Sequence, residues 1–100
     1  MALIQAARPP GNGGGGGGIT ITGWESEQFT QTTNFISGGV VLTLAQTPVV
    51  PASIDLDYNG QTKYLATSFS VTGNQITILF ADPYVTDYDA PPIFHVRYPY

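Results

Sequence analysis

Apolar residues recur at every second position in several short segments of the chain. Ile54, Leu56 and Tyr58 alternate with polar residues, and the same spacing returns in segments 75–80 and 93–98. Alternation of this kind predicts a β-strand with one buried face. Four further segments have the composition of strands: 19–22, 40–44, 61–65 and 69–72. No segment spaces its apolar residues as a helix does over the roughly 11 positions needed to identify one, so the chain is predicted to be all-β.

Two glycine-containing pairs mark the turns between these strands. Asn59-Gly60 separates two alternating segments, which is the strongest short-range signal for a hairpin because both turn positions favour positive φ. Gly73-Asn74 predicts a second hairpin. Residues 25–31 are polar apart from Phe29 and favour extended structure, whereas residues 81–92, rich in Asp, Pro and Tyr, predict a loop. We therefore expect a small antiparallel β-sandwich or flattened barrel over residues 19–100.

The N-terminal segment differs in composition from the rest. Residues 1–10 run from apolar to polar and end in two prolines, and residues 11–18 are glycine except for Asn12. A glycine run has great backbone freedom and no side chains to bury, which is typical of a linker. A dinucleotide-binding glycine motif would need a strand before it and a helix after it, and the flanking sequence predicts neither. We divide the chain into an arm and linker, 1–18, and a β-domain, 19–100.

Composition excludes several kinds of site. The chain has no cysteine, hence no disulfide and no thiolate ligand or nucleophile. Three Lys and Arg against seven Asp and Glu, a net charge of −4, argue against a phosphate-binding face and so against nucleic acid. Residues 1–4 are too short for a signal-peptide core, and no stretch reaches the roughly 20 apolar residues of a membrane span. Neither a membrane nor a nucleic-acid partner is expected.

Two groups of aspartates are candidate metal ligands. Asp55-x-Asp57-x-Asn59-Gly60 matches the first half of an EF-hand loop, but its twelfth position is Ala66 rather than Glu, and the spacing is that of a strand. We interpret Asp55 and Asp57 as solvent-facing residues beside a hairpin turn. Asp82, Asp87 and Asp89 form a second acidic group, interpreted as a hydrated loop with weak calcium binding as the alternative.

Catalytic chemistry finds little support in the sequence. His95 is the single histidine, so it cannot form a zinc site by itself, and it is expected to face solvent or a neighbouring subunit. No serine stands in a nucleophile elbow, and no second histidine is present for a triad. The sequence leaves open a pair of catalytic carboxylates that lie far apart along the chain and come together only in the folded protein. We predict a non-enzymatic protein without a cofactor or metal.

Association with other protein chains explains the small core and the low charge better than catalysis does. A small core without disulfides or a metal is normally stabilised by oligomerisation or docking, and low charge suits interface cores, which are depleted in charged residues. A homo-oligomer is expected, with a trimer as one form. The predicted interface residues come from the arm and from aromatic positions, the tyrosines among them in loop or terminal sequence: Leu3, Ile4, Arg8, Trp24, Tyr84, Tyr88 and Tyr100. The same aromatic rings would also suit sugar stacking, so a carbohydrate-binding or adhesion module is an alternative.

A longer pattern combines these features. Thr47-Pro48 ends one strand, an alternating strand leads to Asn59-Gly60, and a closing strand follows the second hairpin. The matching positions are Thr47, Pro48, Tyr58, Asn59, Gly60, Phe69, Val71, Gly73, Ile76, Ile78, Val96 and Tyr98. Across about residues 40–98, the pattern resembles a β-module of tailed-bacteriophage virion proteins.

The resemblance implies a non-enzymatic structural protein of the virion. It favours a capsid decoration or cement protein, or the base of a head fibre, assembled in the host cytoplasm. The implied partners are other virion proteins, the major capsid protein foremost, and further copies of the chain. A tail, neck or baseplate adaptor is the alternative within the same family.

Overall fold

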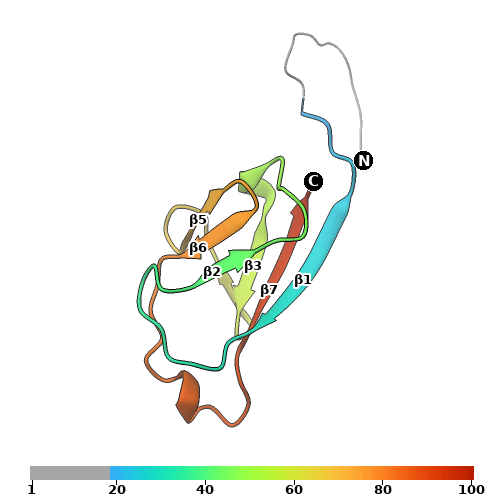
Figure 1. The fold of residues 1–100 in the computed structure, drawn as a ribbon. Helices are drawn as coiled ribbons and strands as arrows, with labels where there is room; N and C mark the ends of the chain where they lie inside the picture. Colours follow the sequence, from blue (N-terminus) through green and yellow to red (C-terminus); the bar gives the residue numbers. More distant parts are fainter. Residues whose placement is uncertain (1–18) are drawn as a thin grey trace.

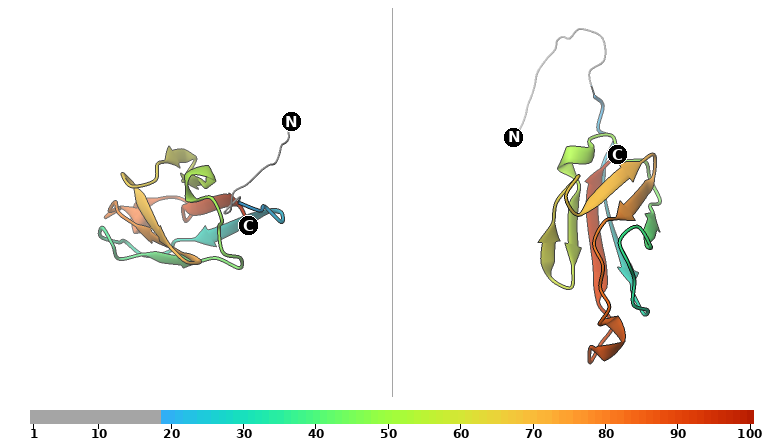
Figure 2. Two further views of the ribbon diagram at one scale, coloured as in Figure 1. Left: turned by 90° about the horizontal axis from the view of Figure 1, so that it is seen from above. Right: turned by 90° about the vertical axis from the view of Figure 1, so that its left-hand side faces the viewer.

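Two antiparallel sheets stacked on one another form the fold of residues 19–100, the part of the chain that the computed structural model describes (Figure 1). One sheet has four strands in the order β1 (Trp24–Thr30), β7 (Ile93–Pro99), β3 (Asp55–Tyr58) and β4 (Gln61–Lys63). The other has three, in the order β2 (Val41–Thr43), β6 (Gln75–Ile78) and β5 (Phe69–Thr72). The view from above in Figure 2 shows the two layers. The predicted all-β sandwich is confirmed, and within residues 19–100 the sheets form no closed barrel.

Strand β7 lies at the centre of the larger sheet. It pairs with β1 over seven residues, from Trp24↔Pro99 to Thr30↔Ile93, and with β3 on its other side. Side chains alternate across a strand, so Phe94, Val96 and Tyr98 point into the sandwich and are at most 1% exposed. The alternation read from segment 93–98 is confirmed.

Both predicted hairpins are present, and their turns have the expected backbone. Asn59 and Gly60 have φ of 51° and 81°, which joins β3 to β4 through a two-residue turn in which both positions have positive φ. In the second hairpin Gly73 has φ of 58° and occupies the first turn position between β5 and β6. These turns fix the register that sends the apolar residues of each strand inward.

The core lies between the sheets and draws on strands of both and on the loops that join them. An aromatic group forms its centre, with Tyr58 and Phe94 ring centroids 4.5 Å apart and Phe35 5.7 Å from Tyr58. The buried apolar side chains are Phe35, Leu42, Leu44, Ile54, Leu56, Tyr58, Phe69, Ile76, Ile78, Val85, Phe94, Val96 and Tyr98. Phe80, expected to share a face with Ile76 and Ile78, lies beyond β6 but still packs against this core.

The strand predicted over residues 19–22 is wrong. Ile19 and Ile21 are 64% and 47% exposed, and β1 begins only at Trp24. The Thr22 and Gly23 N–H groups donate to the Tyr100 carbonyl, but no strand within residues 19–100 pairs with residues 19–21. The polar segment 25–31 instead supplies most of the long strand β1.

Other boundaries shift by a few residues. The return strand predicted over 61–65 ends at Lys63, and the predicted loop 81–92 contains a short 3-10 helix, η2 (Val85–Asp87). A second 3-10 helix, η1 (Pro51–Ser53), precedes β3. No helix in residues 19–100 has the length and apolar character needed to cross a membrane. The arm and linker, with the predicted interface residues Leu3, Ile4 and Arg8, lie outside the described residues.

Candidate functional site

The outward face of the four-stranded sheet carries two rows of polar side chains. Pairing aligns Ser26, Arg97 and Asp55 in one row across β1, β7 and β3. Gln28, His95 and Asp57 form the second row, two residues further along. Neighbouring strands lie about 4.8 Å apart, and alternate residues of one strand about 6.8 Å apart. Strand pairing therefore places six polar groups on a regular grid.

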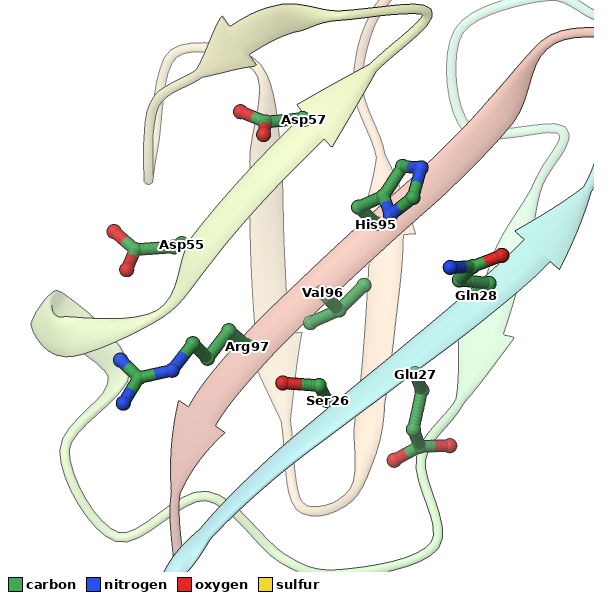
Figure 3. Close-up of a pocket in the computed structure, with 8 residues that line it drawn as sticks. All are labelled: Ser26, Glu27, Gln28, Asp55, Asp57, His95, Val96 and Arg97. Carbon is green, nitrogen blue, oxygen red and sulfur yellow. The ribbon is translucent and has the colours of Figure 1, made fainter.

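These rows line a shallow hollow of about 380 Å³, which we call the outer-face hollow. Figure 3 shows His95 and Arg97 on the central strand, between the aspartates of β3 on one side and Ser26 and Gln28 of β1 on the other. The lining residues are Ser26, Glu27, Gln28, Asp55, Asp57, His95, Val96 and Arg97. Most of these side chains are exposed, so their donors and acceptors face solvent.

Trp24 flanks this hollow at the start of β1. The Arg97 guanidinium carbon lies 4.2 Å from the centroid of the indole ring, a cation–π contact. The ring itself is 45% exposed. Trp24 thus orients Arg97 over the sheet while keeping part of its own apolar surface available.

Glu27 borders the hollow, but its carboxylate serves the fold. The Ala45 N–H donates to Glu27 Oε2 at 3.0 Å, and the Tyr98 hydroxyl donates to the same oxygen. The Gln46 N–H in turn donates to the Tyr98 hydroxyl oxygen at 3.0 Å. Burial, and the hydrogen bond to Glu27, raise the pKa of Tyr98 to about 12. This network ties the larger sheet to the segment that follows β2 of the smaller one.

Asp82 is the second carboxylate with a structural role, and its interpretation as part of a hydrated loop is wrong. It is 6% exposed and accepts hydrogen bonds from the hydroxyls of Tyr58 at 2.7 Å and Tyr88 at 2.9 Å. The Tyr84 N–H adds a third at 3.0 Å. Sequence reasoning missed this role because the Tyr58 partner lies 24 residues away along the chain.

The hydrogen bonds to Asp82 decide its charge state. Burial by itself raises the pKa of the carboxyl group, but the bonds from Tyr58, the Tyr84 N–H and Tyr88 outweigh burial and lower it. Burial, and then the bond to Asp82, raise the pKa of Tyr58. The bond to Asp82 and then burial raise that of Tyr88. The carboxylate is therefore held ionised, and the tyrosines neutral, at the base of the 81–92 loop.

Two other hollows lie elsewhere on the surface. One, of about 270 Å³, borders the Asp82 network and includes Lys63, whose Nζ lies 4.5 Å from the Phe80 ring centroid. The other, of about 340 Å³, is lined by the segment 31–40 and Pro83, and Ile36 in it is 74% exposed. We call this last one the Ile36 groove.

The predicted interface residues do not form one patch. Trp24 and Tyr100 lie where β1 starts and β7 ends, whereas the 81–92 loop with Tyr84 and Tyr88 lies at the opposite end of the sandwich (Figure 1). Tyr84 is 62% exposed and Tyr88 39% exposed, although the Tyr88 hydroxyl is bound to Asp82. The Tyr100 ring is half-buried against the core, with its hydroxyl 3.1 Å from where a Cβ on Gly23 would lie.

The structure also locates the residues that were candidate metal ligands or catalytic groups. Asp55 and Asp57 lie on strand β3 rather than in a loop between two helices, so the EF-hand alternative is excluded. His95 is exposed, on the outer face. In residues 19–100, no three His, Cys, Asp or Glu side chains are grouped so as to hold a metal ion. No protein-family model, curated protein or solved structure matches this chain.

Proposed function

We propose that the protein is a non-enzymatic structural module of a tailed-phage virion, in the position of a capsid decoration or cement protein or a head-fibre base. It binds other virion proteins, the major capsid protein first among them, and further copies of itself, for which a trimer is one arrangement. Its place is the virion, after assembly in the host cytoplasm. A tail, neck or baseplate adaptor is the alternative.

The observation that carries this proposal is the Ile36 groove. Ile36 is 74% exposed, and around it the groove is lined by the apolar residues Phe35, Val40 and Pro83 and by polar residues of segment 31–34. A partner that inserts an apolar side chain beside Ile36 would remove this exposed surface from water, which favours binding.

The strand beside the groove adds backbone groups to the same surface. β2 is an edge strand, since it pairs with β6 on one side only. An edge strand presents unpaired N–H and C=O groups on which a partner can extend the sheet. An apolar groove next to an open edge suits a partner that inserts a side chain while pairing a strand.

Cryo-electron microscopy of intact particles from the phage that encodes this chain tests the proposal. We expect density for the sandwich on the capsid surface, with the Ile36 groove facing a neighbouring protein. Density confined to the tail, neck or baseplate would support the adaptor alternative. Absence of the chain from purified particles would overturn the proposal.

Two variants test whether incorporation into particles depends on the Ile36 groove or on any added charge at the surface. Ile36→Asp should lower the copy number of the protein per particle, while its thermal unfolding stays near that of the wild type. Tyr64→Asp, at a position 65% exposed on another part of the surface, is the matched control and should leave incorporation unchanged. Deletion of residues 1–10 should leave the β-domain folded and weaken incorporation; an unfolded truncated chain would contradict the division at residue 18.

A further inference from the structure

We propose that the outer-face hollow is a binding site for a neutral carbohydrate, a single pyranose ring or one terminal unit of a short glycan. This site goes beyond the assembly role, because it lies on the larger sheet, whereas the Ile36 groove is lined by segment 31–40 and Pro83. A virion protein could therefore carry both.

The hydrogen-bonding groups of the hollow alternate between donors and acceptors. Arg97 offers a fork of N–H donors, flanked in its row by the Ser26 hydroxyl and the Asp55 carboxylate. In the second row His95 lies between the Gln28 amide, a donor and an acceptor, and the Asp57 carboxylate. A sugar hydroxyl both donates and accepts, so neighbouring hydroxyls of one ring match neighbouring groups of this grid.

The charges favour a neutral ligand over an ionic one. Asp55 and Asp57 line one side of the hollow, where they would repel an anion such as a phosphate or sialic acid. Arg97, on β7 between the residues of β1 and β3, offers N–H donors that need an acceptor, which a cation does not supply. A ligand without net charge avoids both penalties and keeps every hydrogen bond.

Size and shape fit a small polar molecule. The volume of about 380 Å³ falls in the range of small-molecule sites, roughly 300–1,000 Å³. Each row crosses three neighbouring strands and is therefore about 10 Å long. At one end the exposed part of the Trp24 ring supplies an apolar surface for the C–H groups of a sugar.

The test uses the full-length chain and neutral sugars. An array of neutral oligosaccharides identifies the preferred terminal sugar, and an NMR titration with cellobiose, maltose and lactose at millimolar concentration locates it. We expect chemical-shift changes at Ser26, His95 and Arg97. Changes centred on Tyr84 and Tyr88, or no change with any sugar, would overturn the proposal.

Matched variants test the residues of the hollow. Asp55→Ala and Arg97→Ala should each weaken binding about tenfold or more, the effect of losing a charge-assisted hydrogen bond. Asp87→Ala removes another exposed carboxylate, from the opposite end of the molecule, and should leave affinity unchanged. Equal losses in Asp55→Ala and Asp87→Ala would contradict the site.

A second copy of the chain is the competing occupant. Its aspartates on β3 could meet Arg97 and His95 of a partner, which would cover the hollow. Dilution of the protein without sugar distinguishes the two: concentration-dependent shifts at His95 and Arg97 would overturn the carbohydrate site. The particle experiment on the Ile36 groove does not depend on this outcome, so either proposal can fail alone.

Discussion

Along strand β7 the side chains of residues 94–98 alternate between the core and solvent, and the two faces of the strand differ in what they contribute. Phe94, Val96 and Tyr98 on the inner face are at most 1% exposed and close-packed. His95 and Arg97, the residues between them, are exposed on the outer-face hollow. Stability therefore depends on the inner residues, whereas the outer residues can change with little cost to the fold.

The carboxylates of the protein divide in the same way, into groups that stabilise the fold and groups that are accessible to solvent. Glu27 accepts a hydrogen bond that ties the larger sheet to the segment after β2, and Asp82 accepts one that ties the 81–92 loop to β3. Asp55 and Asp57 instead lie on the outer face of β3. A buried carboxylate must be fully paired to be tolerated. An exposed one remains available to a ligand. Four of the seven acidic residues thus divide into structural and candidate binding groups.

The largest contrast is expected between neighbours on β7. Phe94→Ala should lower the free energy of unfolding by about 3–5 kcal/mol, because it leaves a cavity in the aromatic centre of the core. His95→Ala should change it by less than about 0.5 kcal/mol. Urea unfolding followed by tryptophan fluorescence measures both. Similar losses in the two variants would mean that the faces are not distinct in stability.

The next effect concerns the buried and exposed carboxylates. Asp82→Asn presents an amide donor to a cluster of donors and should cost about 1.5–3 kcal/mol. Asp57→Asn on the outer face is the matched control, with a cost below about 0.5 kcal/mol. Thermal unfolding at neutral pH compares the two, and an equal loss would contradict the buried network.

The Asp82→Asn variant should also change how the stability of the protein responds to acid. The pKa of Asp82 is lower in the folded protein than its ordinary value of 3.8, so its contribution to stability is present above pH 3.8 and is lost as pH falls below it. Asp82→Asn should therefore lose less stability than the wild type on acidification from pH 5 to 2.5. Parallel pH profiles of unfolding would show that Asp82 is not held ionised by the fold.

The hairpin that keeps β3 and β4 in register is expected to be next in size. At Gly60, φ is 81° and a Cβ would meet no atom within 4 Å, so any cost of a side chain arises from the backbone. Gly60→Val should lower the free energy of unfolding by about 1–2 kcal/mol. Thr62→Val, in the adjacent strand, is the control. An unchanged melting temperature in Gly60→Val would contradict the turn.

The smallest of these effects should come from the hydroxyl of Tyr98. Tyr98→Phe keeps the ring in the core but removes the bonds to Glu27 and Gln46, at a cost of about 0.5–1.5 kcal/mol. Because its pKa is raised from 10.0 to about 12, wild-type stability should fall as pH rises between these values. Tyr98→Phe should show a weaker fall in alkaline unfolding experiments, and an identical fall would exclude this hydroxyl as the cause.

Much of the fold was predictable because its signals are local. Alternation in segments 54–58 and 93–98 reports which side chains face the core, and Asn59-Gly60 needs only its own φ angles to make a turn. Residues 19–22 show the same alternation but form no strand. Their strand prediction failed because a strand also needs a partner, which alternation does not report.

The candidate sites depended on pairings between distant residues. The sequence determined that Asp55, Asp57, His95 and Arg97 alternate with apolar neighbours, and so that they face outward. Only the tertiary structure decided that β1 pairs with β7, which adds Ser26 and Gln28 and completes the hollow. The same holds for Glu27 and Tyr98, 71 residues apart. Local backbone preferences act within a few residues, whereas strand pairing and burial arise when the whole chain packs.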